Sequence, residues 1–155
     1  MSFTLTDDLT AVSEHIYELL LAAKDDLGLS AVYDGDQRLI GTTPVATVEA
    51  GSKVRELIGV PTQTRVDMTV YVMLYVGKIT DTQQNYRDVL ALAQLVEDLI
   101  HSDKDPVTQY ALQGLLVFGM VTTIEPGFAQ RGNTVYRTAR LTFEGFSKVV
   151  GLPAG

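Results

Sequence analysis

Residues 64–76, TRVDMTVYVMLYV, form the clearest alternating stretch in the sequence and decide the fold. One set of alternate positions is apolar throughout: Val66, Met68, Val70, Val72, Leu74 and Val76. The other set mixes polar and aromatic residues: Arg65, Asp67, Thr69, Tyr71, Met73 and Tyr75. A period of two predicts a β-strand with one buried face. At about 3.3 Å per residue it would span roughly 43 Å, and strands usually have about five or six residues, so we expect it to extend beyond its own core.

An amphipathic helix is predicted before this strand, from Asp7 to Leu27. Thr6 or Asp7 can cap its start, and Gly28 stands at the position after a helix end that favours glycine. Its apolar residues recur at spacings of three and four, as one buried helix face requires: Leu9, Val12, Ile16, Leu19, Ala23 and Leu27.

A second helix is predicted after the strand, from Asp81 to Ser102. Thr80 and Gln83 have the spacing of a capping box, in which each side chain bonds a backbone N–H at the helix start. Its apolar stripe consists of Tyr86, Leu90, Ala93, Val96 and Ile100, widened by Val89, Leu92 and Leu99. Asp103 to Pro106 ends the helix.

Shorter strands are predicted at residues 30–33, 45–50, 115–124 and 135–144. Residues 115–124 are apolar at both sets of alternate positions, so we expect that strand to be central or covered on both faces. Residues 34–63 form a long excursion that holds one strand or hairpin, and excursions of this length are often functional.

Glycine and proline residues mark where the predicted strands are interrupted or end. Gly51, Gly59 and Pro61 interrupt the signal in residues 51–61, and Glu125-Pro126-Gly127 predicts a turn. Residues 146–155 are predicted to be a short, partly mobile tail. The resulting order is not a regular βαβ alternation. It predicts one α+β domain over residues 1–155, with a mostly antiparallel sheet and two helices on one of its faces.

Composition limits the function. The 155 residues carry 19 acidic and 12 basic side chains, a net charge of −7, and no cysteine. Phosphates repel an acidic surface, so wrapping nucleic acid is unfavourable, although DNA could slide along such a surface. The chain start lacks a basic cluster followed by an apolar run, and no stretch is long enough to span a bilayer, so no membrane association is expected.

The partial matches of this sequence to catalytic and metal-binding motifs are all incomplete. His15 and His101 are far apart in sequence, and the Asp34-Gly35-Asp36 segment lacks the remaining acidic ligands of a calcium loop. Gly51-Ser52-Lys53 lacks the preceding glycine of a phosphate loop. Ser147 is not followed by the glycine of a nucleophile elbow. The sequence therefore predicts a protein that is not an enzyme and that uses no cofactor and no metal.

Arginine and tyrosine are the residue types that anchor interfaces, and they form the candidate site. Tyr71 and Tyr75 either pack beneath a helix or contact a neighbouring subunit. Arg131, Arg137 and Arg140 either lie at a solvated rim and pair within the chain with Glu125 and Glu144, or meet acidic residues of a neighbour, such as Asp7, Asp8, Asp25 and Asp26. Arg38, Arg55 and Arg65 complete the candidate interface, through the excursion and the end of the long strand.

Seven segments carry a family resemblance when taken in chain order: Asp7–Leu27, Ser30–Tyr33, the irregular stretch to Pro61, Thr69–Val76, Tyr86–Leu92, Glu125-Pro126-Gly127 and Tyr136–Phe143. Together they resemble the tail terminator (tail completion) proteins of long-tailed bacteriophages. The match covers most of the chain and rests on element order. No catalytic residue is carried over, because the family has none.

The resemblance implies a structural virion protein, assembled in the host cytoplasm and located in the tail or neck. Such proteins form hexameric rings at the head–tail junction that cap the tail tube, end its elongation and join it to the head–tail connector or stopper protein. DNA passes through the lumen without specific binding. The alternatives are a head-completion, connector or tail tube protein, and a small ligand-binding α+β domain with a pocket between sheet and helices.

Overall fold

The computed structural model describes residues 5–35, 37, 39–59, 63–78 and 82–150. The helices are α1 (Leu9–Ala22), α2 (Lys24–Leu27), α3 (Thr82–Ser102) and α4 (Ala111–Gly114). The strands are β1 (Ala31–Asp34), β2 (Val45–Gly59), β3 (Gln63–Lys78), β4 (Phe118–Arg131) and β5 (Thr134–Val150). They form one sheet in the order β1-β2-β3-β5-β4. Strand β1 pairs with β2 in parallel and the other neighbours are antiparallel, which confirms the α+β prediction.

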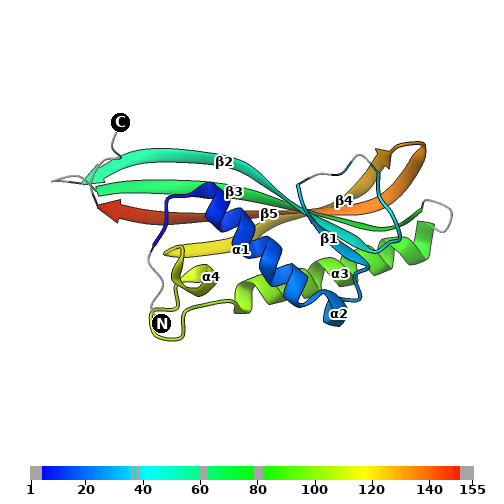
Figure 1. Ribbon diagram of the computed structural model, residues 1–155, viewed down its shortest axis with the longest axis horizontal. Helices are drawn as coiled ribbons and strands as arrows, with labels where there is room; N and C mark the ends of the chain where they lie inside the picture. Colours follow the sequence, from blue (N-terminus) through cyan, green and yellow to red (C-terminus); the bar gives the residue numbers. More distant parts are fainter. Residues whose placement is uncertain (1–4, 36, 38, 60–62, 79–81, 151–155) are drawn as a thin grey trace.

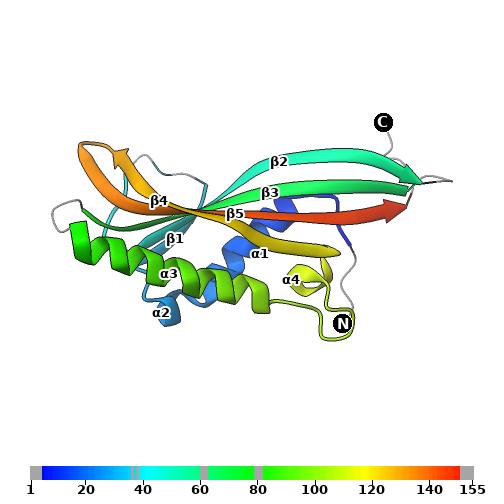
Figure 2. The same cartoon turned by 180° about the vertical axis from the view of Figure 1, so that it is seen from behind.

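The sheet is long and strongly twisted, and α1 and α3 lie side by side beneath it (Figures 1 and 2). Helix α1 packs mainly on β1 and β2, whereas α3 packs on β3, β5 and β4. Two helices on one face of the sheet were predicted, and the structure confirms this arrangement.

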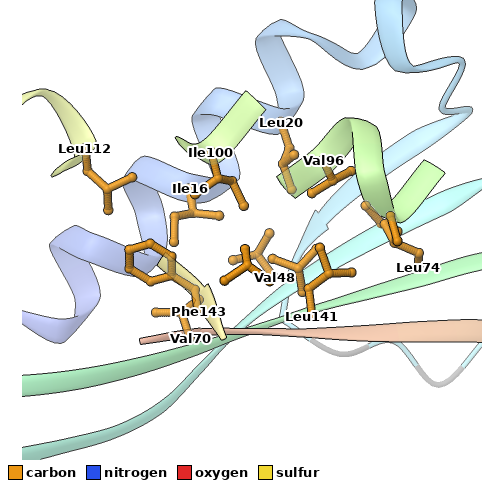
Figure 3. Packing of buried hydrophobic residues seen from close by; sticks show 14 of the residues in the cluster. Ile16, Leu20, Val48, Val70, Leu74, Val96, Ile100, Leu112, Leu141 and Phe143 are labelled. Carbon is orange, nitrogen blue, oxygen red and sulfur yellow. The ribbon is translucent and has the colours of Figure 1, made fainter. Parts of the chain in front are cut away.

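The alternation of residue types in β3 reflects burial of one face of the strand, as predicted. Its apolar set from Val66 to Leu74 is buried beneath the helices. The main core combines this set with apolar residues of α1, α3, β2 and β5, and Figure 3 shows Ile16, Val96 and Leu141 pointing into it. Leu112 and Phe143 close the same core near α4 (Figure 3).

A smaller second core lies on the other face of the sheet. Tyr75 packs there against Ile40, Val45 and Tyr136, and the two tyrosine rings meet edge to face at 6.0 Å. The Tyr136 hydroxyl donates to the Ile40 carbonyl at 3.0 Å. Tyr75 therefore packs inside the protein, under the loop that contains Ile40 and not under a helix.

Strand β2 is longer than predicted. Residues 51–59 are not irregular but continue the strand beside β3. A bulge between Ala50 and Ser52 absorbs Gly51, after which regular pairing resumes. The excursion at residues 34–63 is therefore largely strand, and Asp36 and Pro61 lie outside the described residues.

Strand β4 corrects two predictions. It lies at the edge of the sheet and is mostly exposed, so it is neither central nor covered on both faces. Glu125-Pro126-Gly127 is not a turn, because all three residues pair with β5. An edge strand tolerates Pro126, since its missing N–H can lie on the unpaired side. The turn follows at Gly132, whose φ of +62° favours glycine.

The predicted tail is also partly strand. Residues 146–150 continue β5 and pair with the start of β3, as far as Gln63 with Val150. The first half of β3 therefore has a hydrogen-bonded neighbour along both edges, β2 on one side and the end of β5 on the other. Residues 151–155 lie outside the described part of the chain.

The helices differ from prediction in detail. The first helix divides into α1 and α2 at Ala23, which leaves helical torsion angles. Its cap is Asp8, not Thr6 or Asp7, because an Asp8 carboxylate oxygen accepts from the Thr10 N–H at 3.0 Å. In α3, Tyr86 and Leu90 are exposed and do not belong to the buried stripe. The Thr80 capping box lies outside the described residues.

Replacing Leu141 by alanine should test the main core. Leu141 is fully buried between the sheet and the helices, so its loss should lower the free energy of unfolding by about 2 to 5 kcal/mol. Urea denaturation measures this change. The matched control is Leu57→Ala, because Leu57 is 62% exposed on β2 and its loss should change stability by about 0.5 kcal/mol or less. Equal losses in the two variants would contradict the assignment of the core.

Candidate functional site: the open face of the sheet

The sheet face opposite α1 and α3 is the candidate functional site, and we call it the open face. The loop around Ile40 covers its end near β1, and the remainder is partly exposed. Cross-strand register gathers side chains from four strands there: Asp67 lies beside Val54 and Phe146, and Phe146 lies beside Phe118. Tyr71 lies between Glu49 and Thr142.

One hollow of the open face surrounds Tyr71 and is also lined by Glu49, Arg131 and Arg140. The Arg140 guanidinium lies 5.1 Å from the centre of the Tyr71 ring and pairs with Glu125 at 3.4 Å. Gly51 gives the ring its space, because a Cβ there would lie 2.8 Å from a Tyr71 ring carbon. The hollow thus combines an aromatic surface with a guanidinium held by a carboxylate.

A second hollow lies nearer the end of the sheet, where Arg65, Asp67, Phe118, Met120 and Phe146 line it. The Arg65 guanidinium stands 4.0 Å from the centre of the Phe146 ring and pairs with Asp67 at 3.1 Å. Phe118 is 52% exposed. Exposed aromatic rings beside a positioned arginine are typical of contact surfaces between proteins.

The structure brings four predicted residues to the hollows of the open face and places three others elsewhere. Arg65, Tyr71, Arg131 and Arg140 line its two hollows. Tyr75 is buried in the second core, with Arg131 5.5 Å from its ring centre. Arg38 lies outside the described residues.

Arg55 and Arg137 lie on the helix side of the sheet. Arg55 pairs with Asp7 of its own chain at 2.9 Å, and the Lys53 ammonium donates to the Asp7 carbonyl at 3.1 Å. The hydrogen bond from Arg55 lowers the pKa of Asp7 below its ordinary 3.8, and the charge of Lys53 adds to this effect. Asp7 thereby ties the residues before α1 to β2.

Arg137 lies between two exposed aromatic rings. Its guanidinium is 4.1 Å from the centre of the Phe128 ring and 5.3 Å from that of Tyr86. The sequence predicted Arg137 but missed both rings, together with Phe118, Met120 and Phe146 on the open face. The alternation of β4 contains the signal for Phe118 and Met120, but only its position at the sheet edge shows that they are exposed.

The two histidines connect elements of the helix side. The His15 ring lies 2.6 Å from an Asp103 carboxylate oxygen, which ties α1 to the segment after α3. The Gln113 amide donates to the same carboxylate at 2.6 Å, and His101 accepts from the Val121 N–H at 2.9 Å. Within the described residues no group of three or more His, Cys, Asp or Glu side chains is placed to hold a metal ion. Nor is any described helix both long and apolar enough to cross a membrane.

No protein-family model matches the chain, and no curated protein sequence matches it. Among solved structures, it resembles a chain of the structure described as "Virion of native gene transfer agent (GTA) particle". The two share 17% sequence identity with a TM-score of 0.52, over 90% of this chain and 97% of that one. At this identity the likeness shows a shared fold that spans nearly the whole of both chains.

Replacing Arg55 by methionine should remove the pair with Asp7 and lower the free energy of unfolding at pH 7 by up to about 1 kcal/mol. The pKa of Asp7 is lowered by folding, so this stabilisation is complete above the ordinary carboxyl pKa of 3.8 and is lost as the pH falls below it. Urea denaturation at pH 7 and pH 3 measures the difference between variant and wild type.

A double-mutant cycle with Asp7→Asn controls for effects outside the pair. The two substitutions together should cost less than the sum of their separate effects, because each one alone already breaks the same contact. Strict additivity at pH 7 would contradict the pairing of Arg55 with Asp7.

Proposed function

We propose that this chain is a structural protein of a phage or phage-like virion that forms a ring at the head–tail junction. The single observation that carries the proposal is the shared fold with a chain of a gene transfer agent virion, which covers nearly the full length of both. The order of elements in the sequence, which resembles that of tail terminator proteins, supports the tail end of the junction. The proposed ring is a hexamer that caps the tail tube.

The two edges of the sheet support assembly into a ring. Strand β1 pairs with β2 only as far as Asp34 with Val48, and in the described part of the chain no strand flanks β2 from Glu49 to Gly59. Nor does a described strand pair with the outer edge of β4. Unpaired edges are templates for another chain, and they carry exposed apolar side chains here, such as Val54 and Phe118.

Strand directions make such a contact possible. Strands β2 and β4 run in opposite directions, because antiparallel pairs connect β2 to β3, β3 to β5, and β5 to β4. The β4 edge of one copy can therefore lie antiparallel to the β2 edge of the next. A contact between two different surfaces repeats around a ring when the rotation between copies closes.

The proposed partners are further copies of this chain, the tail tube protein and the head–tail connector or stopper protein. The open face and the ends of the long strands offer Arg65, Tyr71, Phe118 and Arg140 to such neighbours. DNA passes through the lumen without specific binding, because a net charge of −7 opposes stable contact with phosphates. The proposal includes no catalytic step and no cofactor.

Assembly without this chain should yield over-long tails that are not joined to a head. The reason is that a terminator stops the addition of tube subunits and presents the surface that the head connector binds. Negative-stain electron microscopy measures tail length, and supplying the wild-type chain in trans is the control that should restore it.

The same images separate the alternatives. Tailless heads would assign the chain to the tube, and filled heads beside tails of normal length would assign it to head completion or the connector. Complete particles with normal tails would exclude all of these positions.

A further inference from the structure

Three alternate residues near the end of β5 carry a pattern of charge that is complementary to itself. Glu144, Phe146 and Lys148 lie on the open face, because Phe146 pairs with Asp67 and the intervening Ser147 is fully buried on the helix side. Both charged side chains are exposed. The strand therefore presents a carboxylate, an aromatic ring and an ammonium group in that order.

The carboxylate of Glu144 and the ammonium group of Lys148 do not neutralise each other within one chain. Four residues of a strand span about 13 Å, which is too far for a contact between the two groups. None of the ion pairs formed by the described residues includes either side chain. Lys148 lies beside another cation, Arg65 of β3. Both groups are therefore available to a neighbouring molecule.

A largely apolar row crosses the sheet at the level of Phe146. Cross-strand pairing places Val54 of β2, Asp67 of β3, Phe146 of β5 and Phe118 of β4 in one line. Val54 and Phe118 are both more than half exposed. The one charged member, Asp67, is paired at 3.1 Å with Arg65, whose guanidinium also stacks on the Phe146 ring. Burial of this row would supply attraction, and the charges on either side of it would set the orientation.

We propose that this part of the open face packs against the same part of a second copy, about a two-fold axis that follows the apolar row. The axis runs across the strands, so each strand lies over its own counterpart with the order of residues reversed. Glu144 of each copy then faces Lys148 of the other, and Phe146 faces Phe146. Sheets that pack face to face lie about 10 Å apart, a distance that these side chains can bridge.

The order of the charges selects this axis. A two-fold axis along the strands would place β3 of one copy over β5 of the other, so Arg65 would face Lys148 and two cations would meet. The axis across the strands places Arg65 opposite Thr69 instead. It also brings the two Asp67 carboxylates close together, but each is already paired with Arg65 of its own chain.

The contact uses one face of the sheet and neither of its edges. It therefore goes beyond the proposed ring and does not require it. Strands β2, β3 and β5 extend past the start of α1 at this end of the molecule, so the helices do not stand in the way (Figures 1 and 2). Because only the end of one sheet takes part, the contact belongs to the small, weak class of interfaces.

Charge reversal at either position should weaken the contact. Lys148→Glu sets carboxylates against carboxylates, and Glu144→Lys sets ammonium groups against ammonium groups. Each purified variant should self-associate at least about tenfold more weakly than the wild type in sedimentation equilibrium, because like charges at an interface repel. Lys104→Glu makes the same charge change as Lys148→Glu in the exposed segment after α3, and should leave association unchanged.

Exchange of the two charges within one chain is the matched rescue. Glu144→Lys combined with Lys148→Glu keeps the net charge of −7 and restores unlike charges across the axis, so this double variant should associate like the wild type. An equimolar mixture of the two single variants should form dimers with one chain of each kind, because only that combination pairs unlike charges at both positions. Native mass spectrometry counts the two kinds of chain.

Far-UV circular dichroism of each variant confirms folding before association is measured. Phe118→Ala replaces any charge variant that does not fold, because it removes an exposed ring of the apolar row and leaves both charges in place. Its association should also weaken.

The inference is overturned if the wild type remains monomeric at about 1 mM, where even weak specific contacts are populated. It is also overturned if either single variant associates like the wild type, or if the double variant does not regain association. Tail length in assemblies without the chain tests the proposed function separately, so over-long tails combined with unaffected variants would refute this contact alone.

Discussion

The alternation of β3 is the constraint on which the rest of the structure depends. Hydrogen bonds join this strand to β2 along one edge and to β5 along the other, so its register fixes theirs. A slip of one residue would move the apolar set from the helix side to the open face. Helices α1 and α3 cover the apolar side from opposite halves of the sheet. The two helices cover only that side and leave much of the open face exposed.

The same periodicity decides what could be predicted from the sequence. The class of fold, the long strand and both long helices follow from it, because burial of one face imposes the spacing of apolar residues. The ends of β2 and β4 could not be predicted in this way. Gly51 and Pro126 are breakers when considered alone, but a bulge accommodates the first and an edge position accommodates the second. Both depend on strand pairing, which a single sequence does not show.

The residues of the candidate site also differ in how far the sequence could predict their positions. Residue type and alternation were sufficient to select Arg65, Tyr71 and Arg140, and the structure places all three on the open face. Tyr75 belongs to the same alternating set but is buried, because the loop that contains Ile40 crosses the sheet at that point. Tyr86 has the helical spacing of a core residue but is exposed, because α3 presents a wider apolar stripe than the edge of the sheet covers. The path of a loop and the width of a covering surface are tertiary properties that no local period contains.

The two outer edges of the sheet have a consequence for symmetry. In the described part of the chain, β2 beyond Val48 and the outer edge of β4 lack a paired strand, and the two strands run in opposite directions. A contact that pairs the β4 edge of one copy with the β2 edge of the next would use two different surfaces, and it would leave one free edge at each end until a ring closes. A two-fold contact between edges would instead join β2 to β2 or β4 to β4, and it would leave the other edge of each copy unpaired.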